Sequence, residues 1–181
     1  MDSDPIRMES SFTIELYSED RDLGKIVDMI NAAYKRVRYL KEDATRITED
    51  QLRESLSNPQ KQLYLCISSE NVICGSIFLE FFDSDEAEIE ILAVDPKHRG
   101  MGLGPMLLKH AEKEAFLKRH MESVRLNVIP LFQESLIAFY HHLGYQSVDY
   151  TEFPEEKKIK YIQPEYRELI FLMKMRKWAC S

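Results

Sequence analysis

The sequence predicts a mixed α/β domain in which a mostly antiparallel sheet is flanked by helices, in the order β-α-α-β-β-β-α-β-α-β-β. Short apolar or alternating runs typical of strands are interleaved with longer stretches of helical periodicity. Two of the strand-like runs are separated only by the turn-like SEN, as in an antiparallel pair. A glycine-rich turn, RGMGLG, joins a third strand to a helix. We expect residues 11–178 to form one domain and residues 1–10 to be a disordered N-terminus.

The first elements follow from alternation and from capping residues. Residues 12–18 alternate apolar and polar, which predicts a half-buried strand. Ser18 precedes an acidic stretch and is predicted as the N-cap of a helix whose apolar residues recur at helical spacing over residues 23–34. Thr48 and Gln51 form a capping-box pattern, which predicts the start of a second, shorter helix.

The middle of the chain predicts three strands and a helix. Residues 62–68 and 72–82 are the antiparallel pair, and residues 87–94 (AEIEILAV) are the third strand. The helix runs from residue 103 to 120, and Pro105 is tolerated there because it falls in the first turn.

The last third of the chain predicts three strands and one helix. A strand over SVRLNVI is followed by a helix over QESLIAFYHHLG, which ends at Gly144. A strand over YQSVDYTEF and a charged stretch, EEKKIK, lead to the closing strand, ELIFLMKM.

Composition narrows the class of protein. No apolar run reaches the roughly 20 residues of a membrane span, and no signal-peptide pattern opens the chain. The net charge of −7 argues against nucleic-acid binding and fits a cationic partner better. Cys66, Cys74 and Cys180 form no metal-binding or redox motif, and His141-His142 has no matching ligands, so we expect no metal. We expect a reducing compartment, cytoplasmic and possibly nuclear.

The glycine turn predicts an anion site. A strand, a glycine turn and a helix bring unpaired backbone N–H groups and the positive end of the helix dipole to one point. Glycines at positions 100, 102 and 104 let a pyrophosphate approach the backbone, and Arg99 can add positive charge. The P-loop and Rossmann patterns do not fit this spacing, and a turn that binds nothing remains the alternative at this point.

The stretch VDPKHRGMGLGPMLL resembles the acyl-CoA signature of the GNAT superfamily of N-acetyltransferases, R/Q-x-x-G-x-G/A after a strand ending V-x-P. A second landmark of that family, N-x-x-x-x-x-F-Y-x-x-x-G-F/Y, is matched from Gln133 through Phe139-Tyr140 to Gly144-Tyr145. Gln133 replaces the Asn that is usual in the family. The element order matches the GNAT fold over nearly the whole chain.

The resemblance implies acetyl-CoA as co-substrate. Backbone N–H groups at the splayed end of the fourth strand would bind the thioester carbonyl, and the glycine turn would bind the phosphates. The residues that it implies for the cofactor are Leu92, Ala93, Val94, Arg99, Gly100, Met101, Gly102, Leu103, Gly104, Pro105, Asn127 and Gln133.

The implied reaction needs a base and an acid. An amine with a pKa of about 10.4 is neutral in only about 1 molecule in 2,500 at pH 7, a cost of roughly 4–5 kcal/mol. Glu88 and Glu90 share one strand face and are the candidate bases, because a carboxylate can take the proton through water. Glu88 aligns with the base of the histone acetyltransferase branch, but the choice between the two stays open. Tyr140 stands where many members of the family place the acid for the leaving thiolate.

The family places the acceptor opposite CoA, lined here by residues 36–46, residues 81–82 and residues 150–166. Tyr39, Phe82 and Tyr166 are the predicted contacts. Arg38 and Arg46 would suit an acidic group on the acceptor. The nearby acidic residues, which favour a cationic amine such as a small polyamine or a lysine side chain, are Asp83, Asp85, Glu86, Glu88, Glu90 and Glu152.

Two functions from different classes remain. The first is an acetyl-CoA-dependent N-acetyltransferase that acts on a primary amine, and the second is a non-catalytic acyl-CoA-binding module. Retention of Tyr140 and of an acidic strand face favours the enzyme, because a binding module would need only the glycine turn. A homodimer through the last strands is also expected from the family.

Overall fold

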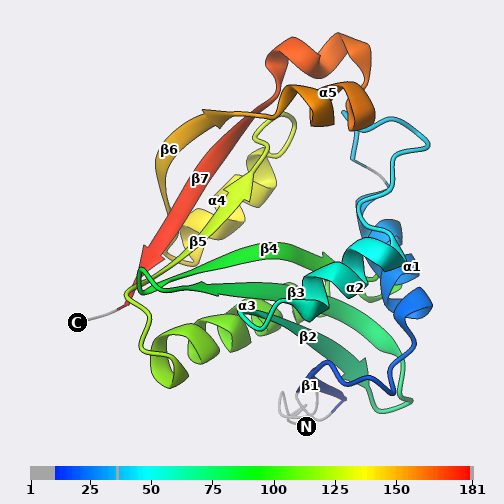
Figure 1. The fold of residues 1–181 in the computed structure, drawn as a ribbon, viewed down its shortest axis with the longest axis vertical. Helices are drawn as coiled ribbons and strands as arrows, with labels where there is room; N and C mark the ends of the chain where they lie inside the picture. Colours follow the sequence, from blue (N-terminus) through cyan, green and yellow to red (C-terminus); the bar gives the residue numbers. More distant parts are fainter. Residues whose placement is uncertain (1–10, 36, 180–181) are drawn as a thin grey trace, which may run out of the picture.

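The computed structural model describes residues 11–35 and 37–179, so the predicted disorder of residues 1–10 lies outside the described part. Seven strands form a single sheet in the order β1-β2-β3-β4-β5-β7-β6 (Figure 1). All neighbouring strands are antiparallel except β4 and β5, which run parallel. The predicted mixed, mostly antiparallel architecture is therefore confirmed.

The elements lie close to their predicted positions. The strands are β1 (Phe12–Leu16), β2 (Lys61–Ser68), β3 (Ile73–Phe82), β4 (Glu86–Val94), β5 (Ser123–Val128), β6 (Gln146–Glu152) and β7 (Phe171–Trp178). The α-helices are α1 (Leu23–Tyr34), α2 (Glu49–Ser57), α3 (Leu103–Glu112), α4 (Glu134–His142) and α5 (Glu155–Tyr161). Short 3-10 turns cover Pro96–His98 and Pro164–Leu169.

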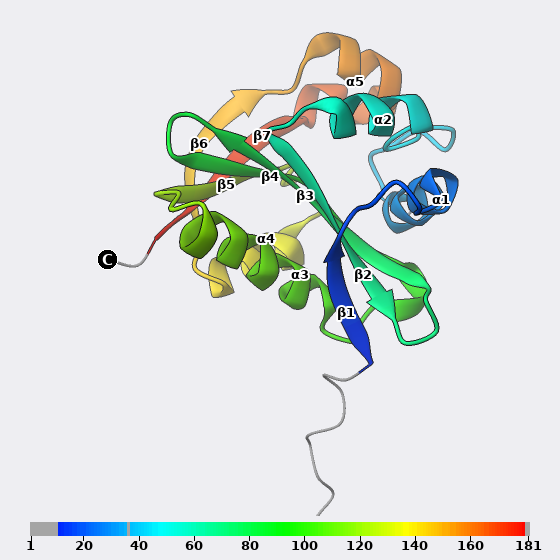
Figure 2. The same ribbon diagram turned by 60° about the horizontal axis from the view of Figure 1, so that its bottom comes forward.

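Helices cover both faces of the sheet (Figures 1 and 2). Helices α3 and α4 pack on one face, over a core that includes Leu79, Leu107 and Tyr140. Helices α1 and α2 pack on the other, over a core that includes Ile30, Leu52 and Phe78. A β-bulge in β4, at the register shift between Phe78 and Leu79, turns the strand, so residues before and after it supply different cores.

Four parts of the chain differ from the sequence prediction by more than two residues. Asp22 and not Ser18 is the N-cap of α1, because its carboxylate accepts from the Lys25 N–H and residues 18–21 form a turn. The helix predicted over residues 103–120 changes at residue 113 into a π-helix that ends at residue 118. The closing strand begins at Phe171 and extends to Trp178.

Helix α5 is the fourth difference, because no helix was predicted over EEKKIK. Its signals were present: Pro154 precedes two glutamates in the first turn, and two lysines lie in the last. The capping box at Thr48 and Gln51 is confirmed, with Thr48 Oγ1 accepting from the Gln51 N–H at 3.3 Å and the Gln51 side chain accepting from the Thr48 N–H at 3.0 Å.

Gly75 on β3 sets how closely α3 approaches the sheet. A Cβ at this position would lie 2.9 Å from Leu107 Cδ1 and 3.0 Å from the Ala93 carbonyl oxygen. We expect Gly75→Ala to lower the free energy of unfolding by about 1–3 kcal/mol, the usual cost of overpacking. Thermal denaturation with Gly104→Ala as the control measures this, since a Cβ at residue 104 meets no atom within 4 Å. A melting temperature of Gly75→Ala equal to that of the wild-type protein would show that α3 can shift on the sheet to make room for the added methyl group.

Candidate active site

Strands β4 and β5 separate at one end of their pairing. Their parallel register runs from Glu86–Ser123 to Ile89–Leu126 and stops there, although β4 continues to Val94 (Figure 1). The end of β4 therefore has no strand on its β5 side. Leu92, Ala93 and Val94, which the sequence predicted for the thioester, lie in this unpaired stretch.

The direction of the β4 backbone follows from its hydrogen bonds. The Leu92 carbonyl accepts from the Tyr34 hydroxyl at 3.2 Å, and the Glu90 carbonyl accepts from Arg46 Nη2 at 3.1 Å. In an antiparallel pair, a residue directs both its N–H and its C=O to the same side, and the side alternates along the strand. The Leu92 N–H thus also points away from β3, toward the unpaired edge.

The glycine turn lies between the end of β4 and the start of α3. Gly100 and Gly102 have φ of +79° and +78°, which L side chains rarely adopt, and Gly102 is the N-cap of α3 without a side-chain cap. Gly104 has no such φ, and a Cβ at any of the three glycines would meet no atom of residues 11–35 and 37–179 within 4 Å. Neither crowding among the described residues nor backbone strain therefore explains the glycine at position 104, and the start of α3 is open to a ligand.

The other predicted residues of the turn differ in what they can offer. Met101 is exposed, whereas the Leu103 side chain is buried in the core and only its backbone could reach a ligand. Pro105 has no N–H to donate. Arg99 Nη2 donates to the Ala33 carbonyl at the end of α1, at 2.6 Å, which ties the turn to that helix.

Asn127, Gln133 and Tyr140 lie on the β5 side of the separation. Asn127 follows the last residue of β5 that pairs with β4, and its Nδ2 donates to Glu88 Oε1 at 2.8 Å. Gln133 is the residue before α4 and has no side-chain capping bond. The Tyr140 ring is buried, and burial, with a smaller contribution from Tyr34, raises its pKa well above the ordinary value, so the phenol stays protonated at neutral pH.

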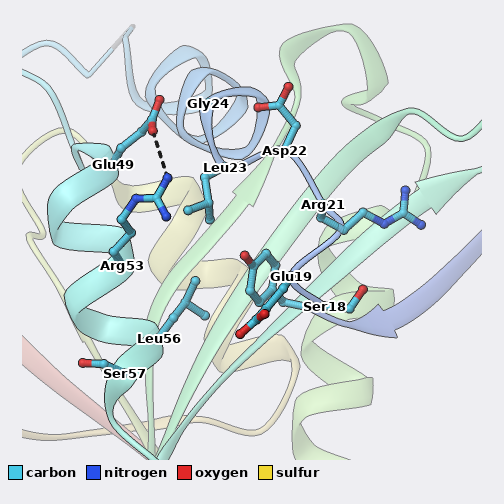
Figure 3. Close-up of a pocket in the computed structure, with 11 residues that line it drawn as sticks. Ser18, Glu19, Arg21, Asp22, Leu23, Gly24, Glu49, Arg53, Leu56 and Ser57 are labelled. Atoms are coloured by element: carbon cyan, nitrogen blue, oxygen red, sulfur yellow. Dashed lines mark ion pairs between the residues drawn. The ribbon is translucent and has the colours of Figure 1, made fainter.

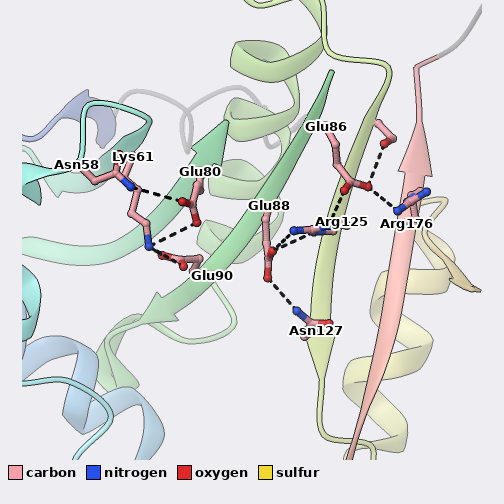
Figure 4. Close-up of polar contacts among 10 residues, drawn as sticks. Asn58, Lys61, Glu80, Glu86, Glu88, Glu90, Arg125, Asn127 and Arg176 are labelled. Carbon is pink, nitrogen blue, oxygen red and sulfur yellow. Dashed lines mark hydrogen bonds and ion pairs between the residues drawn. The ribbon is translucent and has the colours of Figure 1, made fainter. Parts of the chain in front are cut away.

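Glu88 and Glu90 lie in a network of charged side chains that crosses the sheet (Figure 4). Glu88 accepts from Arg125 Nε at 2.9 Å and from Asn127, and Glu90 accepts from Lys61 Nζ at 2.8 and 2.9 Å. The network also contains Glu80, which contacts Lys61 at 3.4 Å, and Glu86, which contacts Arg125 and Arg176.

The network is nearly balanced in charge. Burial lowers the pKa of Lys61, but Glu90 and Glu80 more than offset this, so the pKa is raised and the ammonium stays charged. Every one of the four glutamates therefore has a cationic partner within the chain. The negative charges of these glutamates therefore do not require a cationic group of the acceptor to balance them.

The family model described as the acetyltransferase (GNAT) family matches residues 25–145. The chain belongs to the GNAT family. It is therefore an acetyl-CoA-dependent N-acetyltransferase by class, and the element order, the unpaired end of β4 and the glycine turn fit that membership.

Solved structures of GNAT proteins share the fold. The ribosomal-protein-S18-alanine N-acetyltransferase of Escherichia coli superposes with a TM-score of 0.73 at 19% identity, over 94% of this chain and 95% of that one. A GNAT acetyltransferase of Elizabethkingia anophelis with acetyl-CoA bound gives 0.70 at 17%, over 93% and 99%. The spermidine/spermine N-acetyltransferase of Vibrio cholerae gives 0.68 at 15%, over 94% of each chain. No curated protein matches the sequence significantly.

Of the predicted acceptor contacts, the structure brings Tyr39 and Tyr166 toward the same region. The α1–α2 connection meets the segment between β6 and β7 through a β-bridge between Leu40 and Ile162. Tyr39 is buried beside Ile162, and its pKa rises to about 12, first through burial and then through Tyr34. Tyr166 stacks edge-on against Phe132, with ring centroids 5.5 Å apart.

Phe82 lies elsewhere on the sheet. It pairs with Glu86, so Leu92 is roughly 20 Å further along β4 by strand rise. Its ring contacts the Arg125 guanidinium, 4.8 Å from the ring centroid. Only an extended acceptor could touch both Phe82 and the unpaired end of β4. The contact between Phe82 and the acceptor stays a prediction.

Sequence reasoning missed the contact between Tyr34 and β4, and it did not foresee the contacts that Arg46 and Asn127 make within the chain. Tyr34 was assigned to the apolar face of α1, with no signal that its hydroxyl reaches β4. Arg46 was predicted to suit an acidic group on the acceptor, which stays a prediction, and its guanidinium also donates to the Glu90 carbonyl. Such contacts join residues far apart in the sequence, and no local pattern encodes them.

Three further observations concern the rest of the described chain. A surface hollow of about 830 Å³ lies beside the start of α1 and along α2 (Figure 3), and none of the predicted site residues lines it. Glu49 and Arg53 form an ion pair at 3.7 Å on its wall. Within residues 11–35 and 37–179, no group of three or more His, Cys, Asp or Glu side chains is placed to hold a metal ion. No described helix has the length and apolarity needed to span a membrane.

Proposed function

We propose that the protein transfers the acetyl group of acetyl-CoA to a primary amine by direct attack of the amine. The observation that carries this proposal is the glycine turn, which leaves open space over Gly100, Gly102 and Gly104 at the start of α3, next to the unpaired end of β4. Acetyl-CoA supplies an activated thioester, so that a C–N bond forms as the C–S bond breaks and the free thiol leaves.

Three groups of the chain would bind the phosphates, bind the thioester oxygen and donate a proton to the leaving sulfur. The N–H groups at the start of α3 would bind the phosphates, because Gly102 leaves the helix without a side-chain cap. The Leu92 N–H would bind the thioester oxygen, where negative charge develops. Tyr140 would donate a proton to the leaving sulfur, since its raised pKa keeps the phenol protonated.

Glu90 is the base that the geometry favours. Along β4, Glu90 is roughly 7 Å from Leu92 by strand rise, whereas Glu88 is roughly 13 Å away. The carboxylate of Glu88 accepts hydrogen bonds from two side chains, Arg125 and Asn127. Among the described residues, the carboxylate of Glu90 accepts hydrogen bonds from the Lys61 side chain alone. A proton leaving the ammonium of the acceptor through water would therefore reach Glu90 first.

We expect Glu90→Gln to reduce kcat/KM at pH 7 by about 100-fold, the usual range for loss of a general base, and to restore rate as the pH rises. The reason is that an amine deprotonated by the solvent no longer needs the carboxylate. Thiol release over pH 6–10 measures this, with acetyl-CoA affinity determined alongside. Glu88→Gln is the matched control, with the same change of charge on the same strand face. A pH profile that shifts for Glu88→Gln and not for Glu90→Gln would assign the base to Glu88.

The acceptor is proposed to be a small cationic amine or a lysine side chain. The name of one structural neighbour gives spermidine and spermine as its substrates, and that of another gives the alanine of a ribosomal protein. The four glutamates of the network are already paired within the chain, which weakens the argument for a polyamine with several charges. An acceptor that presents a single amine fits the balanced charge better.

A further inference from the structure

The unpaired edge of β4 is occupied by two side chains from the α1 side of the molecule. Beyond Ile89, where β5 no longer pairs, the Glu90 and Leu92 carbonyls would be expected to lack donors. Arg46 Nη2 donates to the first at 3.1 Å, and the Tyr34 hydroxyl donates to the second at 3.2 Å. The two side chains thus occupy the place that a neighbouring strand would otherwise take.

These two donors are held in place by their own contacts. Asn31 Oδ1 accepts from the N–H groups of Arg46 and Ile47 at 2.7 and 3.1 Å, and Asn31 Nδ2 donates to the Ile47 carbonyl at 2.9 Å. The Arg46 guanidinium also lies over the Tyr34 ring, 5.3 Å from its centroid. Helix α1 therefore fixes the backbone of Arg46, and the ring of Tyr34 supports its side chain.

The position of the Leu92 N–H gives this arrangement a consequence for catalysis. Along the chain this N–H lies between the Glu90 and Leu92 carbonyls, and both carbonyl oxygens face the same side, because Arg46 and Tyr34, which contact each other, donate to them. Both oxygens carry partial negative charge and would repel an acyl oxygen held at the N–H. A guanidinium on one oxygen and a hydroxyl hydrogen on the other offset that repulsion, and Arg46 adds a full positive charge nearby.

We propose that Arg46 and Tyr34 are positioning residues for acetyl transfer, which hold the end of β4 so that the Leu92 N–H can donate a hydrogen bond to the thioester carbonyl oxygen in a locally positive environment. The inference rests on the proposed function, because it concerns the same thioester. It adds two side chains that stand outside both family motifs and act through the backbone of β4.

The first test is spectroscopic and does not require turnover. With acetyl-CoA labelled with ¹³C at the acetyl carbonyl, difference infrared spectra report how strongly the bound carbonyl is polarised, because a stronger hydrogen bond lowers the C=O stretching frequency. We expect binding to lower this frequency in the wild-type protein, and the shift to shrink in Tyr34→Phe and in Arg46→Met. Arg46→Lys, which keeps the charge and a donor, should recover most of the shift. Arg53→Met removes an exposed arginine of α2 and is the control.

The second test is kinetic. We expect Arg46→Met and Tyr34→Phe each to lower kcat by about tenfold, less than the loss of a direct oxyanion donor, while the dissociation constant of acetyl-CoA stays within about twofold. A purely structural role would instead raise that dissociation constant or lower the melting temperature, without a recovery in Arg46→Lys.

The outcomes separate this inference from the function on which it rests. Equal infrared shifts in wild type, Tyr34→Phe and Arg46→Met would overturn the inference and leave the acetyltransferase intact. A wild-type protein that fails to bind acetyl-CoA would overturn the proposed function, and this inference with it. A reduced shift with unchanged binding, restored in Arg46→Lys, is the result that we expect.

Discussion

We expect Gly104→Glu to weaken acetyl-CoA binding severely although the protein remains folded. Gly104 lies in the first turn of α3, and a Cβ there meets no atom of the described part of the chain within 4 Å, so the fold tolerates a side chain at this position. The new carboxylate would project where the phosphates are expected. Like charges brought together at a binding site cost several kcal/mol, so the affinity should fall by about 100-fold or more. Calorimetric titration with acetyl-CoA measures the change.

Two control variants show whether the loss is local. Gly104→Ala adds bulk without charge and should weaken acetyl-CoA binding less than Gly104→Glu does, while stabilising the helix by up to about 1 kcal/mol. Leu117→Glu introduces the same charge at an exposed position in the π-helical turn that follows α3, and it should bind normally. Gly102 is less suited to this test, because its φ of +78° would strain any side chain. Normal affinity in a folded Gly104→Glu protein would contradict the assignment of the turn.

We expect Tyr140→Phe to lower kcat by about 100-fold without weakening acetyl-CoA binding, within the usual range for loss of a general acid. The ring is buried against Phe139 and Tyr145, with centroids 5.2 and 5.8 Å apart, so phenylalanine keeps the packing and removes only the hydroxyl. Because burial raises the pKa of this phenol above its ordinary value of 10.0, the acid should still be protonated at pH 10. Steady-state rates of thiol release, measured for the wild type and Tyr140→Phe up to pH 10, should show the lower kcat of the variant throughout.

Tyr145→Phe is the matched control for Tyr140→Phe. Tyr145 is also buried, and its hydroxyl has no hydrogen-bond partner in the part of the chain that the structure describes, so its loss should not change kcat. If Tyr140→Phe and Tyr145→Phe had equal, wild-type rates, Tyr140 would be a packing residue. The acid would then have to come from water or from another side chain.

Local signals predicted most of the fold. The capping box at Thr48 and the strands over residues 62–68 and 72–82 were found because their patterns are short and contiguous. The N-cap of α1 was misplaced because Ser18 and Asp22 are both good caps, and the choice depends on where the chain leaves β1. Helix α5 was missed because it has no buried residue and hence no apolar periodicity.

The sequence predicted the glycine turn of the candidate site, which is formed by consecutive residues. It predicted less well the parts that depend on contacts between strands. Glycine spacing indicated the turn, but the end of the β4–β5 pairing at Ile89 and Leu126 depends on tertiary structure alone. Two glutamates on one strand face were predicted from alternation, whereas their partners Lys61 and Arg125 come from β2 and β5. The sequence for this reason left the base undecided, and the unequal pairing of Glu88 and Glu90 gives a reason to prefer one.

The central claim is acetyl transfer from acetyl-CoA to an amine, and the most direct measurement is product formation with a panel of amines. The panel contains a simple alkyl monoamine, spermidine, a lysine-containing peptide with a blocked N-terminus and a peptide with a free N-terminal alanine. We expect at least one amine to gain an acetyl group in an amount equal to the thiol released, at a rate proportional to protein concentration and reduced in Tyr140→Phe. Tight binding of acetyl-CoA with no acetylated amine and no thiol release above the protein-free background would contradict this account. It would favour a non-catalytic acyl-CoA-binding module instead.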